Sequence, residues 1–203
     1  MPDKATGLLY GLTNFTIGRV SLTEQGSDSV PQSLMLSIAD QEVAIKPIAD
    51  YPHIVRSLRP RRDTAVTCEL AVRFGAEEEI STTDATVNDL LWLMSLARSS
   101  LVSICYRKKV GADGAVLGIT HWDHKTRPYC GERCLISPSS YRDTQAFLGA
   151  ALSNFGKQRD LFGLPVAIEA YLESKLSSNK EISFLLACVA IECLRDNFAR
   201  DVG

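Results

Sequence analysis

The chain has 203 residues, of which 45% are hydrophobic and 23% are charged. These values are ordinary for a globular chain with one large domain or two small ones. The formal net charge of −2 gives the whole chain no strong attraction to nucleic acid or to an anionic membrane. Any such contact would have to come from a local patch.

The sequence predicts a cytoplasmic protein that makes no membrane contact. Its start, MPDKATGLLYGL, has no basic region followed by a long apolar run, which a secretory signal would have. The most apolar stretch, ISFLLACVAI at 182–191, has about half the length that a bilayer crossing needs and predicts a buried helix. In the cytoplasm the six cysteines should be reduced, and four of them lie in apolar segments, where cysteine acts as a small hydrophobe.

The first 83 residues predict a series of strands separated by clusters of Gly, Pro, Asn and Ser. The expected strands are 7–12, 15–22, 33–39, 42–48 and 64–74. The last is the clearest, because Val66, Cys68, Leu70 and Val72 alternate with other residues and should face a core.

A single helix should interrupt the strands. Apolar residues follow helical spacing from Val87 to Ala97, and the candidate N-caps before them are Thr82, Thr83 and Asp84. Two more strands, 101–109 and 115–122, flank a turn in which Asp113-Gly114 predicts a β-hairpin.

From residue 137 onward the pattern predicts three helices, at 137–155, 165–176 and 180–200. The third is apolar on every face from Phe184 to Ile191, which is typical of a helix covered on all sides. The β-rich part, a second copy of the chain or further helices could supply that cover. Within this apolar helix, a buried Glu192 should need a raised pKa or a partner, such as an arginine from another helix.

The expected fold class is therefore α+β. Residues 1–136 should form an antiparallel β-rich N-terminal domain, sandwich-like or barrel-like, with one inserted helix. Residues 137–203 should form a C-terminal helical region.

The stretch THWDHKTRPYCGERCLI contains four candidate zinc ligands, His121, His124, Cys130 and Cys134. Zinc takes four such ligands in tetrahedral geometry, and a short segment can provide them. Two features oppose a zinc site. The cysteine spacing is C-x3-C instead of C-x2-C, and histidines three apart on a strand point to opposite faces. The alternative is a hairpin end that binds no metal, and both interpretations stay open.

The same region carries a basic patch. Between residues 101 and 142, seven Lys or Arg and three acidic residues give a local charge of +4. The candidate nucleic-acid-binding residues are Arg107, Lys108, Lys109, Lys125, Arg127, Arg133 and Trp122. Clustered cations beside aromatic rings suit a phosphate backbone or single-stranded bases. The alternative is a hairpin tip whose charges are simply solvated.

Several segments, in this order, resemble bacterial proteins in which a β-rich domain precedes a HEPN (higher eukaryote and prokaryote nucleotide-binding) domain. The segments are LLWLMSLARSSLVSI, the basic hairpin, FLGAALSNF and LPVAIEAYLESKLSSNKEISFLLACVAIECLRD. Some proteins of this type, the ApeA-like group among them, act in abortive anti-phage defence. The resemblance implies that the C-terminal helices dimerise and that the chain ends inside the HEPN region.

The resemblance also implies a ribonuclease motif, R-x4-6-H, on a later helix. No histidine follows His124, so no such motif is present and no catalytic residue can be carried over from the family. The chain also lacks G-x-S-x-G, P-loop and H-E-x-x-H motifs. No residue is therefore assigned a catalytic role.

Three hypotheses of function follow. The first is a non-catalytic sensor or interaction module of a HEPN-type defence protein, which contacts RNA or a phage-derived molecule through residues 105–134. The second is a ribonuclease effector that is active only in a longer or dimeric form. The third is a zinc-stabilised structural domain.

Overall fold

A computed structural model describes residues 5–17, 33–38, 41–61, 63–73, 80–122, 127–129 and 134–202. The helices and strands follow one another in this order: β1 (Ala5–Thr13), β2 (Leu34–Ile38), β3 (Gln41–Pro47), α1 (Tyr51–Arg61), β4 (Val66–Arg73), α2 (Ile80–Arg98), β5 (Ile104–Gly111), β6 (Val116–His121), α3 (Tyr141–Gln158), α4 (Leu164–Leu176) and α5 (Lys180–Val202).

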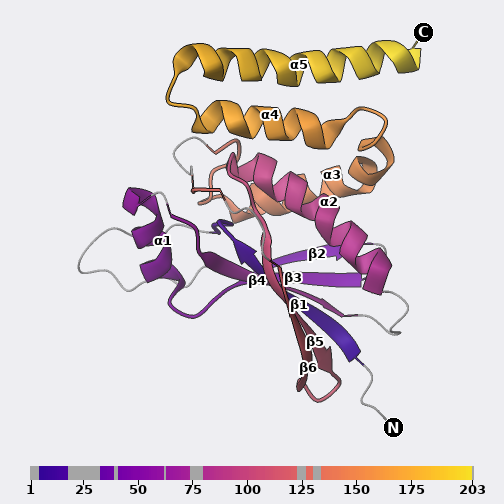
Figure 1. The fold of residues 1–203 in the computed structure, drawn as a ribbon. Helices are drawn as coiled ribbons and strands as arrows, with labels where there is room; N and C mark the ends of the chain where they lie inside the picture. Colours follow the sequence, from indigo (N-terminus) through magenta and orange to yellow (C-terminus); the bar gives the residue numbers. More distant parts are fainter. Residues whose placement is uncertain are drawn as a thin grey trace.

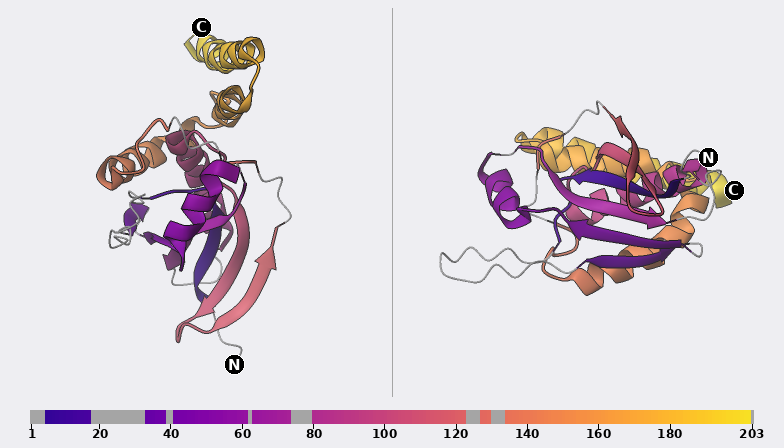
Figure 2. Two further views of the ribbon diagram at one scale, coloured as in Figure 1. Left: turned by 90° about the vertical axis from the view of Figure 1, so that its left-hand side faces the viewer. Right: turned by 90° about the horizontal axis from the view of Figure 1, so that it is seen from below.

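The six strands form one sheet in the order β2-β3-β4-β1-β5-β6, and every neighbouring pair is antiparallel. Helices α2 and α3 lie against one face of this sheet (Figure 1). No described helix crosses the opposite face, as the view from below shows (Figure 2). The α+β class is confirmed, and the described strands form a single open sheet instead of a sandwich or a barrel.

Alternation along the strands determines which sheet face packs against the helices. On β1, Leu8, Tyr10 and Leu12 are buried, and Leu70 and Val72 of the set predicted on β4 are buried beside them, whereas Val66 is only half-buried. Successive side chains of a strand point to opposite faces, so one apolar set per strand is enough to make a core. The core cluster continues into α2, α3 and α4 and therefore crosses residue 136, where we expected a domain boundary.

Helix α1 is not among the elements that the sequence predicted. It buries Tyr51, Val55 and Leu58, which are four and three residues apart and therefore lie on one side of a helix. The Tyr51 hydroxyl accepts a hydrogen bond from the backbone N–H of Ile17 and donates one to the Ile17 carbonyl. The N-terminal part thus contains two helices, α1 and α2, where we expected one.

Helix α2 begins at Ile80, before the three residues that we predicted as N-caps. Thr83 is consequently buried inside the helix, and Asp84 lies on its second turn. The predicted strand at 15–22 lies largely outside the described residues.

The predicted β-hairpin is confirmed in β5 and β6. Gly114 has φ +84°, a left-handed conformation that glycine adopts without strain. The Gly114 N–H donates to the Gly111 carbonyl, and the Asp113 carboxylate accepts from the Ala115 N–H. The turn is therefore fixed by the two residue types that suggested it.

The three predicted C-terminal helices are also present. Helix α3 packs against α2 and β2, whereas α4 and α5 form an antiparallel hairpin stacked above them. Figure 2 shows α5 as the outermost layer, at the opposite end of the molecule from β6. No helix in the described part of the chain has the length and apolarity that crossing a membrane requires.

Candidate functional site

The described cations of the basic hairpin region do not lie on one face of the sheet. Arg107 forms an ion pair with Asp84 of α2, and Asp84 also accepts a hydrogen bond of 2.7 Å from the hydroxyl of Tyr10. Register places Tyr10 opposite Arg107 on the helix-covered face of the sheet. The Arg107 guanidinium also lies over the Trp122 ring, 5.3 Å from its centroid. Burial and the hydrogen bond to Asp84 raise the pKa of Tyr10, so this phenol stays protonated.

Replacing Asp84 with alanine should destabilise the fold by about 1.5 kcal/mol, because the buried Tyr10 hydroxyl would lose its acceptor. The ion pair itself adds little, since the Asp84 side chain is 39% exposed. Asp84→Asn retains an acceptor and should cost less than Asp84→Ala. Urea unfolding measures both variants, with Glu42→Ala, an exposed side chain of β3, as control. Equal stability of Asp84→Ala and wild type would contradict this prediction.

The next residues along β5 belong to the opposite face of the sheet. The Tyr106 ring lies directly over Gly11, where an added Cβ would come within 2.4 Å of it. The Tyr106 hydroxyl donates to Glu69 at 2.6 Å, and Lys108 Nζ pairs with the same carboxylate at 3.2 Å. Lys108 also lies 4.6 Å from the Tyr106 ring centroid. This cation is therefore held by residues of β4 and β5.

Arg127 has a third environment, between the sheet and the helical hairpin. Its carbonyl accepts hydrogen bonds from the Asn14 amide at 2.8 Å and from the Thr64 hydroxyl at 3.0 Å. Its guanidinium forms ion pairs with Glu169 and Glu173 of α4. Arg127 thus connects α4 to the end of β1.

The structure therefore separates the predicted nucleic-acid-binding residues. Arg107 and Lys109 lie on the helix-covered face of β5, Lys108 lies on the other face, and Arg127 contacts α4. Lys125 and Arg133 lie outside the described residues. Three of the cations already pair with carboxylates of the same chain, and nucleic-acid contact stays a prediction.

The candidate zinc ligands are described only in part. His121 ends β6, with its ring 6.4 Å from that of Tyr106, and Cys134 lies in the segment before α3. His124 and Cys130 are outside the described residues. Among the residues that are described, no group of three or more His, Cys, Asp or Glu side chains could hold a metal ion. Zinc binding stays a prediction.

A buried arginine, Arg98, connects the sheet to the C-terminal helices. Its Nε donates to the Thr16 carbonyl at 2.7 Å, its Nη1 to the Ile136 carbonyl at 3.0 Å and its Nη2 to the Thr144 hydroxyl at 3.0 Å. The guanidinium also lies 4.9 Å from the centroid of Phe15. Burial lowers the pKa of Arg98.

Sequence reasoning missed Arg98, although a signal was present. The residue follows Met94 by four positions and therefore lies on the buried side of α2. The carboxylates that pair with the hairpin cations were missed as well, because they come from β4, α2 and α4.

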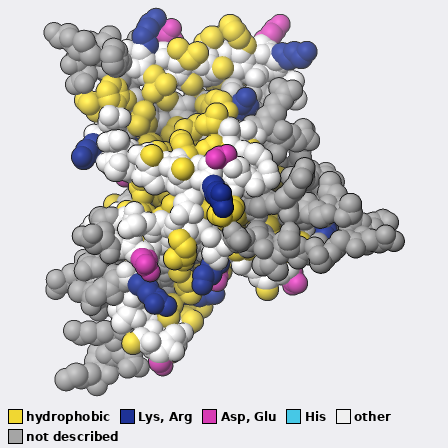
Figure 3. All heavy atoms as spheres, turned by 180° about the vertical axis from the view of Figure 1, so that it is seen from behind, with side chains coloured by type: hydrophobic (Ala, Val, Ile, Leu, Met, Phe, Trp, Pro, Cys, Tyr) yellow, Lys and Arg dark blue, Asp and Glu magenta, His cyan; other side chains and the backbone are white. Residues whose placement is uncertain are grey.

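The other unusual surface is the outer side of the helical hairpin. Figure 3 shows hydrophobic side chains gathered over α4 and α5. Exposed large hydrophobic residues on and beside this hairpin are Leu161, Val166, Ile182, Phe184, Leu185, Val189, Ile191 and Leu194. Phe184 is 69% exposed and Ile191 is 64% exposed. The stretch 182–191 is helical as predicted, but the rest of the described chain does not bury it.

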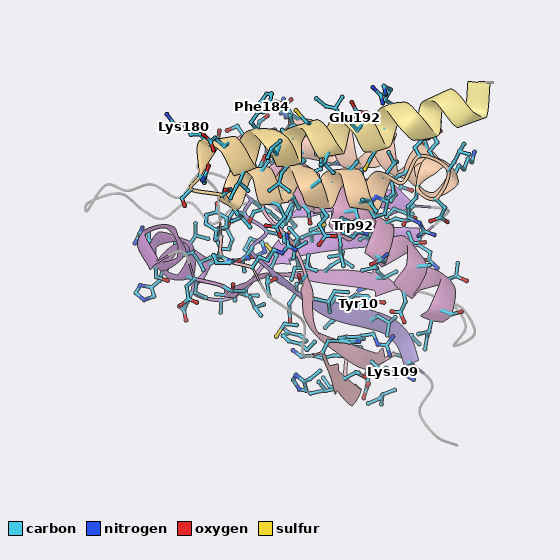
Figure 4. The ribbon with its side chains drawn as sticks, turned by 45° about the horizontal axis from the view of Figure 1, so that its top comes forward. Tyr10, Trp92, Lys109, Lys180, Phe184 and Glu192 are labelled. Atoms are coloured by element: carbon cyan, nitrogen blue, oxygen red, sulfur yellow. The ribbon has the colours of Figure 1, made fainter. Side chains whose placement is uncertain are left out.

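Glu192 also differs from expectation. It points outward from α5, as Phe184 does (Figure 4), and its side chain is 50% exposed. It forms an ion pair with Arg195, one turn along the same helix. The partner is therefore on the same helix and not on another one, and the carboxylate is not buried.

Two open hollows on the described surface have linings without side chains arranged for acid–base catalysis. One open hollow of about 530 Å³ lies at the start of β1 and the ends of β4 and β5, and Arg73 is the one charged residue in its described lining. A second hollow, of about 600 Å³, lies between β2 and α3, and Arg142 is the one charged residue in its described lining. A single cation without a carboxylate or imidazole beside it provides no acid–base pair.

Comparison with known proteins adds no assignment. No family model, curated protein or solved structure matches this chain.

Proposed function

We propose that this protein is a non-catalytic interaction module that associates with a second copy of itself through α4 and α5. The observation that carries the proposal is the exposed apolar surface of α5. Exposed apolar patches of this kind are typical of protein–protein contacts. Helix α5 packs mainly against α4, and apolar residues project from both flanks of its free side. A second helical hairpin is the partner that would cover both flanks.

The charges on α5 favour a second copy in antiparallel orientation. Lys180 and Glu181 lie at the start of the exposed ridge, and Glu192 and Arg195 lie about three turns later. A two-fold axis perpendicular to α5 makes the two α5 helices antiparallel, so each end of one helix meets the other end of its partner. That arrangement brings unlike charges within reach, whereas a parallel pair would oppose each charge to its own copy.

We also propose, from the resemblance to HEPN-type proteins, a role in defence. An interaction module of a HEPN-type defence protein, located in the cytoplasm, would use helical association in this way. Ribonuclease activity of a longer or dimeric form is the alternative, and a nuclease assay on this chain and on an extended chain distinguishes the two.

Charged substitutions among the exposed apolar residues of α5 should abolish self-association. Leu185 is 62% exposed and Val189 is 47% exposed, and both lie on one flank of α5. The double variant Leu185→Glu/Val189→Glu would place four charges in a two-fold interface and should weaken the dimer at least ~100-fold, or about 2.7 kcal/mol. Sedimentation velocity across a concentration series measures the effect.

The control is Met35→Glu on β2. Met35 is also an exposed apolar residue, at 44%, but it lies away from the helical hairpin. This variant should dimerise like the wild type. A wild-type chain that stays monomeric at high concentration, or a double variant that still dimerises, would refute the proposed interface.

A further inference from the structure

Strand β6 is an edge of the described sheet, and its described residues carry neither the lysine nor the proline that often protects an edge. Proteins block edge strands with lysine, proline, bulges or a covering helix. From Val116 to Thr120 the strand has no charged residue and no proline, and Ile119 is 53% exposed. The opposite edge, β2, differs because α3 packs against it. Among the described residues, β6 is paired with β5 alone.

The direction of the free backbone groups follows from the ladder. The Trp122 N–H donates to the Cys105 carbonyl at 3.1 Å, which makes these residues a hydrogen-bonded pair. Hydrogen-bonded and non-hydrogen-bonded pairs alternate in an antiparallel ladder. Thr120 and Gly118 therefore also bond to β5, whereas Ile119 and His121 direct their N–H and C=O groups away from the sheet. The pairing register of β5 with β6 is regular from Gly118 to His121. Its one shift lies between Lys109 and Val110, nearer the turn.

This edge is complementary to itself about Thr120. With a two-fold axis there, the free groups of Ile119 meet those of His121 in the second copy, and two hydrogen bonds form on each side of the axis. Thr120 then faces its own copy, a favourable cross-strand pair. Gly118 faces Trp122 of the second copy, and a Cβ at Gly118 would find no atom within 4 Å. That space can accept an aromatic ring, as Gly11 accepts Tyr106 in the same sheet.

We infer that β6 is a second self-association surface, at which two copies of the chain join their sheets in antiparallel register around Thr120. The contact is short, so the association is weak and transient. It does not depend on the association through α4 and α5, because the two surfaces lie at opposite ends of the molecule (Figure 2).

A cysteine pair can trap this register. Residues that face each other in a non-hydrogen-bonded pair have Cα atoms about 4.5 Å apart, within the range of a disulfide. Thr120→Cys should therefore form an intermolecular disulfide upon mild oxidation, with two thiols losing two electrons and two protons to added diamide. Gly118→Cys is the control. Two such residues would be separated by four strand positions, about 13 Å, which is too far for a bond.

The experiment uses the full chain with Leu185→Glu and Val189→Glu to remove association through α5. Cys188→Ser and Cys193→Ser remove the thiols of that helix, and mass spectrometry identifies the linked residues. We expect at least five-fold faster cross-linking for Thr120→Cys than for Gly118→Cys. Adding Ile119→Pro should abolish the difference, because proline removes an outward N–H without breaking the ladder to β5.

Equal cross-linking of the two variants would overturn the inference, as would the absence of a disulfide between the positions 120. A difference that persists with Ile119→Pro would also overturn it, provided that circular dichroism shows the variant to be folded. Since the background lacks the α5 contact, failure here leaves the sedimentation result of the α5 variants unaffected.

Discussion

Replacing Arg98 with methionine should lower the free energy of unfolding by about 3 kcal/mol, which corresponds to a decrease in Tm of roughly 6–12 °C for a chain of this size. The side chain is fully buried, and its three guanidinium nitrogens donate hydrogen bonds to two carbonyls and one hydroxyl. Methionine fills much of the space but leaves these acceptors without a donor, at a cost of about 1–3 kcal/mol each. Removing a buried charge offsets part of that loss.

Two further variants make this prediction specific. Arg98→Lys keeps the charge but cannot reach three separate acceptors, so it should also destabilise the protein. Arg142→Met, on the exposed side of α3, should leave the free energy of unfolding nearly unchanged. Calorimetry or urea unfolding provides the comparison, and an Arg98→Met protein as stable as Arg142→Met would show that the buried network is dispensable.

Gly11→Val should destabilise the sheet by about 2–3 kcal/mol. The new side chain would occupy the place of the Tyr106 ring, whose atoms lie 2.4–2.8 Å from a Cβ at this position. The ring would have to turn away, and its hydroxyl would lose the bond to Glu69. Glycine is thus required here by the close approach of an aromatic ring.

A double-mutant cycle separates this cause from a general intolerance of the strand. In a Tyr106→Ala background the space over Gly11 is free, so Gly11→Val should cost almost nothing, and the coupling energy should be about 2 kcal/mol. Urea unfolding of the four proteins gives the value. Additive effects would mean that the ring is not the obstacle.

Local patterns made much of the fold predictable. Strand β4 shows strict alternation, and the turn between β5 and β6 contains the Asp-Gly pair that favours a hairpin. Such signals lie within ten residues and need no knowledge of the tertiary structure. Helix α1 was missed because its apolar residues lie among basic residues and two prolines, Pro52 and Pro60.

The candidate site was less predictable, because charge composition does not reveal pairing. The +4 charge of residues 101–142 suggested a cationic surface. The carboxylates that pair with Arg107, Lys108 and Arg127 are 23, 39 and 42 positions away in sequence and meet them only through strand register and helix packing. By contrast, the apolar pattern of α5 correctly predicted a helix, but the described chain does not bury it as we expected.

The attachment of α5 has a consequence for how the protein unfolds. Helix α5 is supported mainly by α4, through apolar contacts and a 2.6 Å hydrogen bond from Ser183 to the Ser174 carbonyl. Helix α4, in turn, joins the body through Arg127, the Ser99–Tyr171 hydroxyl pair and core residues such as Leu172. When one helix is held mainly by the next in this way, the chain contains units that unfold at different free energies. The last helix can therefore detach while the sheet stays folded, and a partner bound to α5 would raise the free energy of that first opening step.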